Sequence, residues 1–196
     1  MNKSQKKQLA SVINAKPEKN RPDIRTDVVK NWTMEDLLPA VQQSLEGRNF
    51  ERGRRMYRVA QCSQCHQMNG AGGITGPNLT TVGQRFSREY ILESIIKPSE
   101  EISNRFRRSA IKKSDGSTVY GRIVNIHGST LHVMKNPMDP SNLTNINRKN
   151  VKSIEPADTS SMPPGLINTL NKQEVLDLMG YLISGGDPDH KIFQDN

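Results

Sequence analysis

The residues best suited to chemistry in this 196-residue chain form one run, Cys62-Ser63-Gln64-Cys65-His66, which contains both of its cysteines. Two thiols at this spacing can each form a thioether to one of the two vinyl groups of a single porphyrin. The histidine that follows can turn beneath the iron and offer an imidazole nitrogen as an axial ligand. The C-x-x-C-H run therefore predicts a haem c attachment site at Cys62, Cys65 and His66.

Three other interpretations of the two cysteines stay open at this stage. A thioredoxin-like redox pair needs its C-x-x-C at a strand-to-helix turn, whereas the residues before Cys62 have a helical pattern. A zinc site needs four ligands, and a chain with two cysteines would have to recruit a distant histidine or carboxylate. A structural disulfide would leave the adjacent His66 without a role. Haem attachment explains all three residues together.

A haem iron with one histidine ligand has a sixth coordination position, for which the eight methionines and three further histidines are candidates. Most methionines fill gaps in cores, so the position of each one in the chain matters. Met162 stands out because prolines follow it at positions 163 and 164, and a stiff loop suits a weak, neutral thioether ligand. The less favoured candidates lie in a predicted β region or in the tail: His127, His132, Met134, Met138 and His190.

Two segments around the run resemble class I cytochrome c: residues 53–66, and residues 75–85 with the motif Thr75-Gly76-Pro77-Asn78-Leu79. The resemblance implies that the Pro77 carbonyl accepts a hydrogen bond from Nδ1–H of His66, which fixes the tautomer of the ligand. It also implies that Leu79 packs on the haem face and that Arg85 pairs with a propionate.

The same resemblance assigns roles to residues outside the loop. Class I cytochromes place their methionine ligand just before the last helix, which is the position of Met162. Gly53 and Tyr57 would lie where the first helix crosses the last, near Leu178 and Tyr181, with glycine allowing a close approach. A haem bound there would add a large apolar body to the core.

The chain is also similar to the haem-binding domain family described from planctomycetes and verrucomicrobia. The similarity runs from about residue 31 to about residue 184, through motifs in the same order: Asn31-Trp32-Thr33-Met34-Glu35-Asp36-Leu37-Leu38, C-x-x-C-H, Gly76-Pro77-Asn78-Leu79-Thr80, Lys97-Pro98-Ser99, Asp115-Gly116 with Gly121-Arg122, and Ser161-Met162-Pro163-Pro164-Gly165-Leu166. Such domains usually end large secreted proteins that carry dehydrogenase-like domains. The similarity implies that the chain is a fragment of such a protein, located in the periplasm or otherwise outside the cytoplasm.

Apolar periodicity and capping residues predict four helices that position these groups. They cover residues 33–47, then 50–59 directly before Cys62, then a helix that Ser87 caps and Pro98 stops. The last begins at Asn171 and Glu174 and ends at Gly185-Gly186. Residues 67–85, rich in Gly, Asn and Thr, are expected to form a loop.

Between the third and last helices the pattern changes to short β-prone runs separated by turn residues. Strands are expected at residues 107–112, 118–126, 130–134, 143–147 and 151–154, which together suggest a small antiparallel β-barrel of the Sm or SH3 kind. The expected fold is therefore a mainly α cytochrome c unit with an inserted β-barrel, α+β overall. Its parts are a basic linker (1–30), the discontinuous cytochrome unit (31–104 and 156–185), the β insert (105–155) and a tail (186–196).

Composition limits the remaining function classes. Only 33% of the residues are hydrophobic, so a large self-sufficient core is not expected, and a bound cofactor would supplement it. The net charge is +8, but residues 1–30 alone carry eight Lys/Arg and three Asp/Glu, which favours a solvated linker over a nucleic-acid surface. The chain shows no apolar run long enough for a membrane span and no secretory signal.

The sequence thus predicts a one-electron carrier that is not itself an enzyme and that accepts electrons from an attached or separate dehydrogenase or other redox protein. A haem enzyme or gas sensor with an open sixth position is the main alternative. A remote alternative is a nucleic-acid-binding module built on an Sm-like barrel, although residues 105–155 have few aromatic side chains for stacking.

Overall fold

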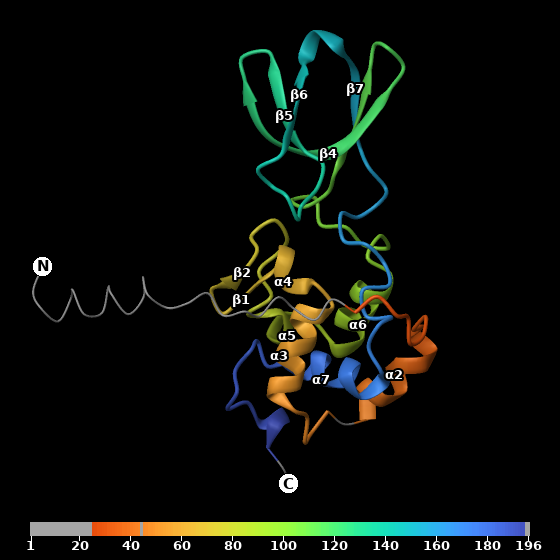
Figure 1. The fold of residues 1–196 in the computed structure, drawn as a ribbon, viewed down its shortest axis with the longest axis vertical. Coiled ribbons are helices and arrows are strands. Elements are labelled where there is room, and N and C mark those ends of the chain that lie inside the picture. Colours follow the sequence, from red (N-terminus) through yellow and green to blue (C-terminus); the bar gives the residue numbers. More distant parts are fainter. Residues whose placement is uncertain (1–24, 44, 195–196) are drawn as a thin grey trace, which may run out of the picture.

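The helices and the main β-sheet occupy separate parts of the molecule (Figure 1). The structure is a computed structural model that describes residues 25–43 and 45–194. The helices are α2 (Met34–Gln43), α3 (Phe50–Val59), α4 (Cys62–Cys65), α5 (Val82–Arg85), α6 (Arg88–Ile96) and α7 (Lys172–Ile183), with short 3₁₀ turns η1 (Arg148–Asn150) and η2 (Lys191–Phe193). The strands are β1 (Gln67–Met68), β2 (Ala71–Gly72), β3 (Ser109–Lys113), β4 (Thr118–His127), β5 (Thr130–Met134), β6 (Leu143–Asn147) and β7 (Val151–Pro156). The fold is mixed α and β, as predicted.

Side-chain caps fix the starts of the helices. The Ser87 side chain accepts a hydrogen bond from the Tyr90 amide at 3.1 Å, and α6 follows directly. Asn171 and Glu174 form a reciprocal capping box at the start of α7. Both caps were predicted. The Asn49 side chain caps α3 by accepting a hydrogen bond from the Arg52 amide, and this cap was not predicted.

The helix predicted for residues 33–47 is shorter than expected, because α2 ends at Gln43. The apolar period nevertheless continues past the helix, since Leu45 is completely buried in the core. At the other end of the helical unit, α7 ends as predicted, with Gly185 and Gly186 at φ values of 68° and 74°. None of the helices in the described residues is long and apolar enough to cross a membrane.

The close crossing of α3 and α7 is confirmed. A Cβ atom on Gly53 would lie 2.4 Å from the Asp177 carbonyl oxygen and 2.9 Å from Cβ of Tyr181, so only glycine fits there. The Tyr57 and Tyr181 rings pack with their centroids 5.4 Å apart, and Leu178 is completely buried beside them. This crossing forms the centre of the helical core.

The segment expected to be one loop, residues 67–85, contains the β1–β2 hairpin and the short helix α5. Met68 pairs with Ala71, and the two residues between them, Asn69 and Gly70, have positive φ values of 48° and 78°. An Asn-Gly pair is the preferred sequence for a two-residue hairpin turn. The signal for this hairpin was therefore present in the sequence.

The expected β insert forms a five-stranded antiparallel sheet with the strand order β6-β5-β4-β3-β7. Ile111, Leu131, Val133 and Ile146 are buried on one face and form a second core, separate from the helical core. The predicted Sm- or SH3-like barrel is not confirmed, because the five strands do not close into a barrel. Within the described residues β6 pairs only with β5, and β7 only with β3, and η1 lies between β6 and β7 in the chain.

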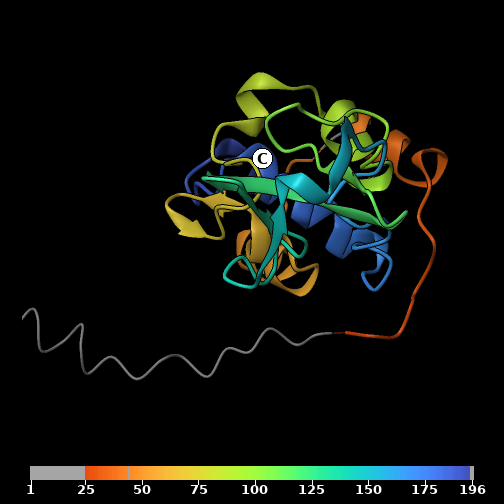
Figure 2. The same cartoon turned by 90° about the horizontal axis from the view of Figure 1, so that it is seen from above.

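The sheet lies at one end of the long axis of the molecule, above the end of the helical unit that carries α4 and the β1–β2 hairpin (Figure 1). Seen along that axis, the strands project over the helices (Figure 2). The chain enters the sheet after α6 and returns from β7 to α7. The residues around the cysteines therefore lie between the helical core and the sheet.

Both ends of the described chain pack on the helical unit. The Val29 amide donates a hydrogen bond to the Asn168 carbonyl at 2.8 Å, and Ile192 in the C-terminal segment is 3% exposed. The Phe193 ring meets the Phe50 ring edge-on at 5.3 Å. Most of the predicted basic linker, residues 1–24, lies outside the described residues.

Candidate haem attachment site

Helix α3 delivers the chain to the two cysteines. After Val59 the backbone turns at Gln61, which has a positive φ of 59°, and the single turn α4 carries both cysteines. The amide of His66 closes this turn on the Cys62 carbonyl at 2.9 Å. Residues at positions i and i+3 share one face of a helix, so both thiols project to the same side.

The surroundings of the two cysteines bear on two of the alternatives. Both thiols are free and half-buried, so this structure contains no disulfide between them. Burial raises the pKa of the Cys62 thiol to about 12, so the free thiol is neutral. The described residues bring together no cluster of three or more His, Cys, Asp or Glu side chains that could hold a metal ion, as a zinc site would require.

The His66 ring is held in one orientation. Its Nδ1 lies 2.8 Å from the Pro77 carbonyl oxygen, as the resemblance implied. A carbonyl oxygen only accepts, so Nδ1 carries the proton and Nε2 keeps its lone pair. Burial lowers the pKa of the imidazole, and this keeps it neutral. A neutral ring with an available Nε2 is the form that binds iron.

The loop after α4 wraps closely around the C-x-x-C-H turn. The Gly73 amide donates to the Ser63 carbonyl at 2.9 Å, and the Gly76 amide donates to the Cys65 carbonyl at 2.7 Å. A Cβ on Gly76 would lie 2.9 Å from both Nδ1 and Cε1 of His66. Glycine at this position therefore lets the backbone reach the ring and bring Pro77 to it.

Tyr57, on helix α3 before the cysteines, also contacts the histidine. Its hydroxyl donates to the His66 carbonyl oxygen at 2.8 Å. Burial raises the pKa of this phenol, so it stays protonated and remains a donor. The resemblance to class I cytochrome c implied only a helix-crossing role for Tyr57, because its contact with His66 depends on how α3 leads into α4.

The other predicted site residues lie at different depths. Leu79 and Met162 are half-buried and pack on the same apolar core as Cys62. The Met162 amide donates to Ser160 Oγ at 3.1 Å, which stiffens the loop before α7. Arg85 lies on the surface at the end of α5, with its guanidinium 5.1 Å from the Phe86 ring centroid.

The less favoured iron ligands lie in or beside the sheet and in the C-terminal segment. His132 Nδ1 is 2.8 Å from Asn145 Oδ1 on the neighbouring strand, and Met134 is 5% exposed. Met138 is 40% exposed in the connection between β5 and β6, and His127 is exposed at the end of β4. His190 Nδ1 accepts a hydrogen bond from the Ile192 amide at 3.2 Å.

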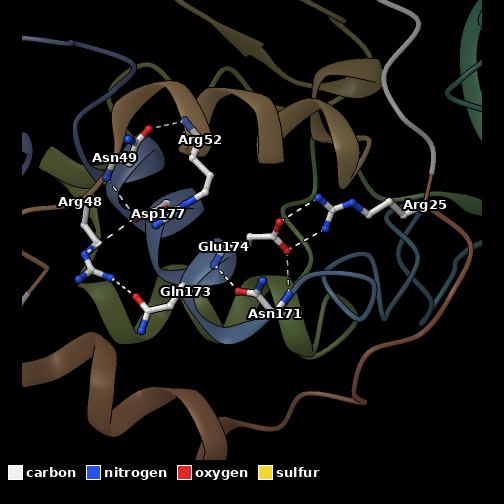
Figure 3. Close-up of polar contacts among 8 residues, drawn as sticks. All are labelled: Arg25, Arg48, Asn49, Arg52, Asn171, Gln173, Glu174 and Asp177. Atoms are coloured by element: carbon white, nitrogen blue, oxygen red, sulfur yellow. Dashed lines mark hydrogen bonds and ion pairs between the residues drawn. The ribbon is translucent and has the colours of Figure 1, made fainter.

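A buried polar cluster between α3 and α7 was not predicted (Figure 3). The Asp177 side chain is completely buried, where its carboxylate accepts hydrogen bonds from the Asn49 amide and from Nε of Arg52. Glu174 binds both terminal nitrogens of Arg25 at 2.8 Å. Buried carboxylates are stable only when paired in this way, so Asp177 ties the start of α3 to α7, and Glu174 ties Arg25 to α7.

Comparison with known families agrees with this geometry. The family model described as Cytochrome c matches residues 50–153, more than half of the chain, so the chain belongs to this family. No curated protein matches the chain significantly. Domains of this family bind haem c covalently, generally carry electrons, and are typically found outside the cytoplasm. The matched residues include the C-x-x-C-H run and most of the sheet, and they end before Met162 and α7.

The residues of this chain fit haem c. They supply two free thiols on one face of a helical turn, an imidazole whose Nε2 is available, and apolar side chains packed on a shared core. The donor set suits thioether attachment better than a zinc site, because the described residues place no further ligand cluster around the two cysteines.

Proposed function

We propose that this chain is a one-electron carrier in which Cys62 and Cys65 hold a single haem c, with His66 and Met162 as the axial ligands. The observation that carries the proposal is the 2.8 Å contact between His66 Nδ1 and the Pro77 carbonyl, next to two free thiols. This contact orients the ring and makes Nε2 a stronger donor. A bound haem c supplies an iron that alternates between the ferric and ferrous states.

The surrounding residues control the environment of that iron. Leu79 would exclude water from one side, and Arg85 would neutralise a propionate at the surface. Met162 would provide a neutral sulfur that favours the ferrous state. The Ser160 hydroxyl contact and the two prolines after Met162 support this role, because a stiff loop compensates for a weak ligand.

The wider setting of the carrier is also part of the proposal. Residues 31–104 and 156–185 would form the cytochrome unit, with residues 105–155 as an insert whose strand order suggests an opened Sm- or SH3-like arrangement. The planctomycete and verrucomicrobial family is the subfamily that we propose, on the motifs from Asn31 to Leu166. The chain would then work outside the cytoplasm, joined through residues 1–30 to a dehydrogenase-like domain that passes electrons to it.

The deciding experiment is production in a host that attaches haem c, followed by intact-mass measurement and a pyridine haemochrome assay. We expect one covalent haem in the wild type, and loss of covalent attachment when both Cys62 and Cys65 are replaced by alanine. A colourless wild-type protein at the bare polypeptide mass would overturn the proposal.

The second axial ligand is tested separately, by Met162→Ala with Met138→Ala as the matched control. Met162→Ala should lower the potential, remove the weak far-red ferric band of an iron–methionine bond, and let the reduced protein bind CO. Met138 is 40% exposed, so its replacement should leave all three unchanged. An unaltered spectrum in Met162→Ala would assign the sixth position to another residue.

A haem enzyme or gas sensor remains the second candidate, because the family match ends before Met162. In that case the wild-type reduced protein would already bind CO readily. The carrier proposal predicts that it does not.

A further inference from the structure

Thr75 connects the loop around His66 to the β-sheet through two hydrogen bonds. Its hydroxyl donates to the Pro137 carbonyl at 3.0 Å, and its own carbonyl accepts from a terminal nitrogen of Arg122 at 2.9 Å. Pro137 lies in the connection between β5 and β6, which reaches toward α4 and β2 in Figure 1. The hydroxyl and the carbonyl of Thr75 are therefore both hydrogen-bonded to residues of the β insert.

Arg122 is oriented for this contact by its own surroundings. It lies on β4 opposite Met134 of β5, and it is half-buried. Its guanidinium lies 5.7 Å from the ring centroid of Phe106, in the segment that leads from α6 into the sheet. A cation over an aromatic face, with one N–H bound to a carbonyl, has few alternative positions.

The contact is transmitted to the histidine through a short stretch of backbone. Gly76 follows Thr75, packs against the His66 ring and donates its amide to the Cys65 carbonyl at 2.7 Å. Pro77 comes next and accepts the hydrogen bond from His66 Nδ1. One residue thus separates the carbonyl bound by Arg122 from the carbonyl that orients the ring, so a displacement of Thr75 moves Pro77.

We propose that Arg122 and Thr75 are positioning residues for the axial histidine, and that the β-sheet fixes the His66–Pro77 hydrogen bond by clamping Thr75. This inference rests on the proposed function, and it gives the sheet a role in setting the redox potential. A firm Nδ1–H···O bond increases the basicity of the imidazole and stabilises the ferric state. Release of the clamp should therefore favour the ferrous state and raise the potential.

The first test uses Thr75→Val, which removes the hydroxyl and leaves the charge and the branched shape unchanged. Its control is Thr118→Val, at an exposed position of β4. In the haem-loaded protein we expect Thr75→Val to shift the ferric–ferrous equilibrium toward the ferrous form by roughly threefold, since Thr75 acts one step further out than a direct partner of a ligand, whose loss costs about 10- to 100-fold in metal affinity or activity. Thr118→Val should show no shift.

The second test uses Arg122→Gln, with Arg148→Gln in η1 as a control that removes the same charge from an exposed position. Backbone hydrogen exchange is compared for residues 72–78. Loss of the Arg122 contact should accelerate exchange of the Gly76 amide by about tenfold, while exchange in α3 and α7 stays unchanged. Arg148→Gln should leave both regions unchanged.

The proposal is overturned if Thr75→Val and Thr118→Val have equal potentials, since a purely structural contact would not change the potential. It is also overturned if the Gly76 amide exchanges at the same rate in Arg122→Gln and Arg148→Gln. Faster exchange throughout the chain in Arg122→Gln would overturn it as well. Failure of covalent attachment in the wild type would remove the proposed function, whereas the exchange comparison separately supports or overturns the clamp.

Discussion

Nδ1 of His66 lies 2.8 Å from the carbonyl oxygen of Pro77, although the two residues are eleven positions apart in sequence. The hydrogen bonds of Gly73 and Gly76 to the C-x-x-C-H turn hold this pair together within the polypeptide itself. The polypeptide itself therefore fixes the orientation of the His66 ring, so the ring would already be positioned when a cofactor binds.

Gly76→Ala tests how closely the loop must approach the ring. The added Cβ would lie 2.9 Å from Nδ1 of His66, so the ring and Pro77 must separate. We expect the haem-loaded variant to favour the ferrous form by about tenfold, the lower end of the effect of losing a direct partner of a ligand. Redox titration measures this shift.

The control for that variant is Gly70→Ala. A Cβ on Gly70 meets nothing within 4 Å, but the positive φ of 78° makes alanine strained by about 1 kcal/mol. Gly70→Ala should therefore lower stability without altering the potential. Equal potentials in the two variants would contradict the assignment of Gly76 as the residue that admits Pro77 to the ring.

Tyr57→Phe removes the hydroxyl that donates to the His66 carbonyl at 2.8 Å. The ring can still pack on Tyr181, so the expected loss is that of one hydrogen bond, about 1 kcal/mol in the free energy of unfolding. Denaturant unfolding gives this value, with Tyr120→Phe as the control because Tyr120 is 50% exposed on the sheet. If both variants are equally stable, the Tyr57 hydroxyl does not support the turn.

The Arg25–Glu174 pair predicts how stability depends on pH. Arg25 holds the pKa of the Glu174 carboxyl below its usual value of 4.5, so the unfolded chain binds the proton more readily than the folded one. The stabilisation is therefore complete above about pH 4.5 and is lost as the pH falls through the lower pKa of the folded state.

Arg25→Gln should destabilise the protein by about 1 kcal/mol at pH 7, since the pair is bidentate but half-exposed. Urea unfolding at a series of pH values should show the difference from wild type shrinking below about pH 4.5. Lys97→Gln, which removes an exposed pair with Glu93, is the control and should have a smaller effect at every pH. A difference for Arg25→Gln that does not depend on pH would refute the pairing.

Local signals account for what the sequence could predict. Ser87 and Asn171 mark helix starts because their side chains bond to amides only a few residues ahead. The strands were found because turn residues such as Asp115-Gly116 separate them. The Asn69-Gly70 hairpin carried the same kind of signal, within a segment whose composition indicated a loop.

The remaining features depend on contacts between distant parts of the chain. Arg122 meets Thr75 across 47 residues, and Asp177 binds the Asn49 amide across 128. Neither residue has a neighbour in sequence that marks its partner. Closure of the sheet was equally hard to predict, because strand periodicity indicates which side faces the core but not whether β6 reaches β7.

Gly53→Ala tests the crossing of α3 and α7 that supports the end of α3. The added Cβ would lie 2.4 Å from the Asp177 carbonyl and 2.9 Å from Cβ of Tyr181, two groups that cannot rotate away. Overpacking of this kind costs about 3 kcal/mol, which outweighs the roughly 1 kcal/mol that alanine gains over glycine in a helix. We therefore expect denaturant unfolding to show a net loss of about 2 kcal/mol in the free energy of unfolding.

The control is Arg54→Ala, on the exposed side of α3, which should lose less than about 0.5 kcal/mol in the free energy of unfolding. Because α3 leads directly into Cys62, Gly53→Ala should also reduce the yield of covalently attached haem. A variant as stable as wild type would mean that α3 and α7 do not need glycine at their crossing.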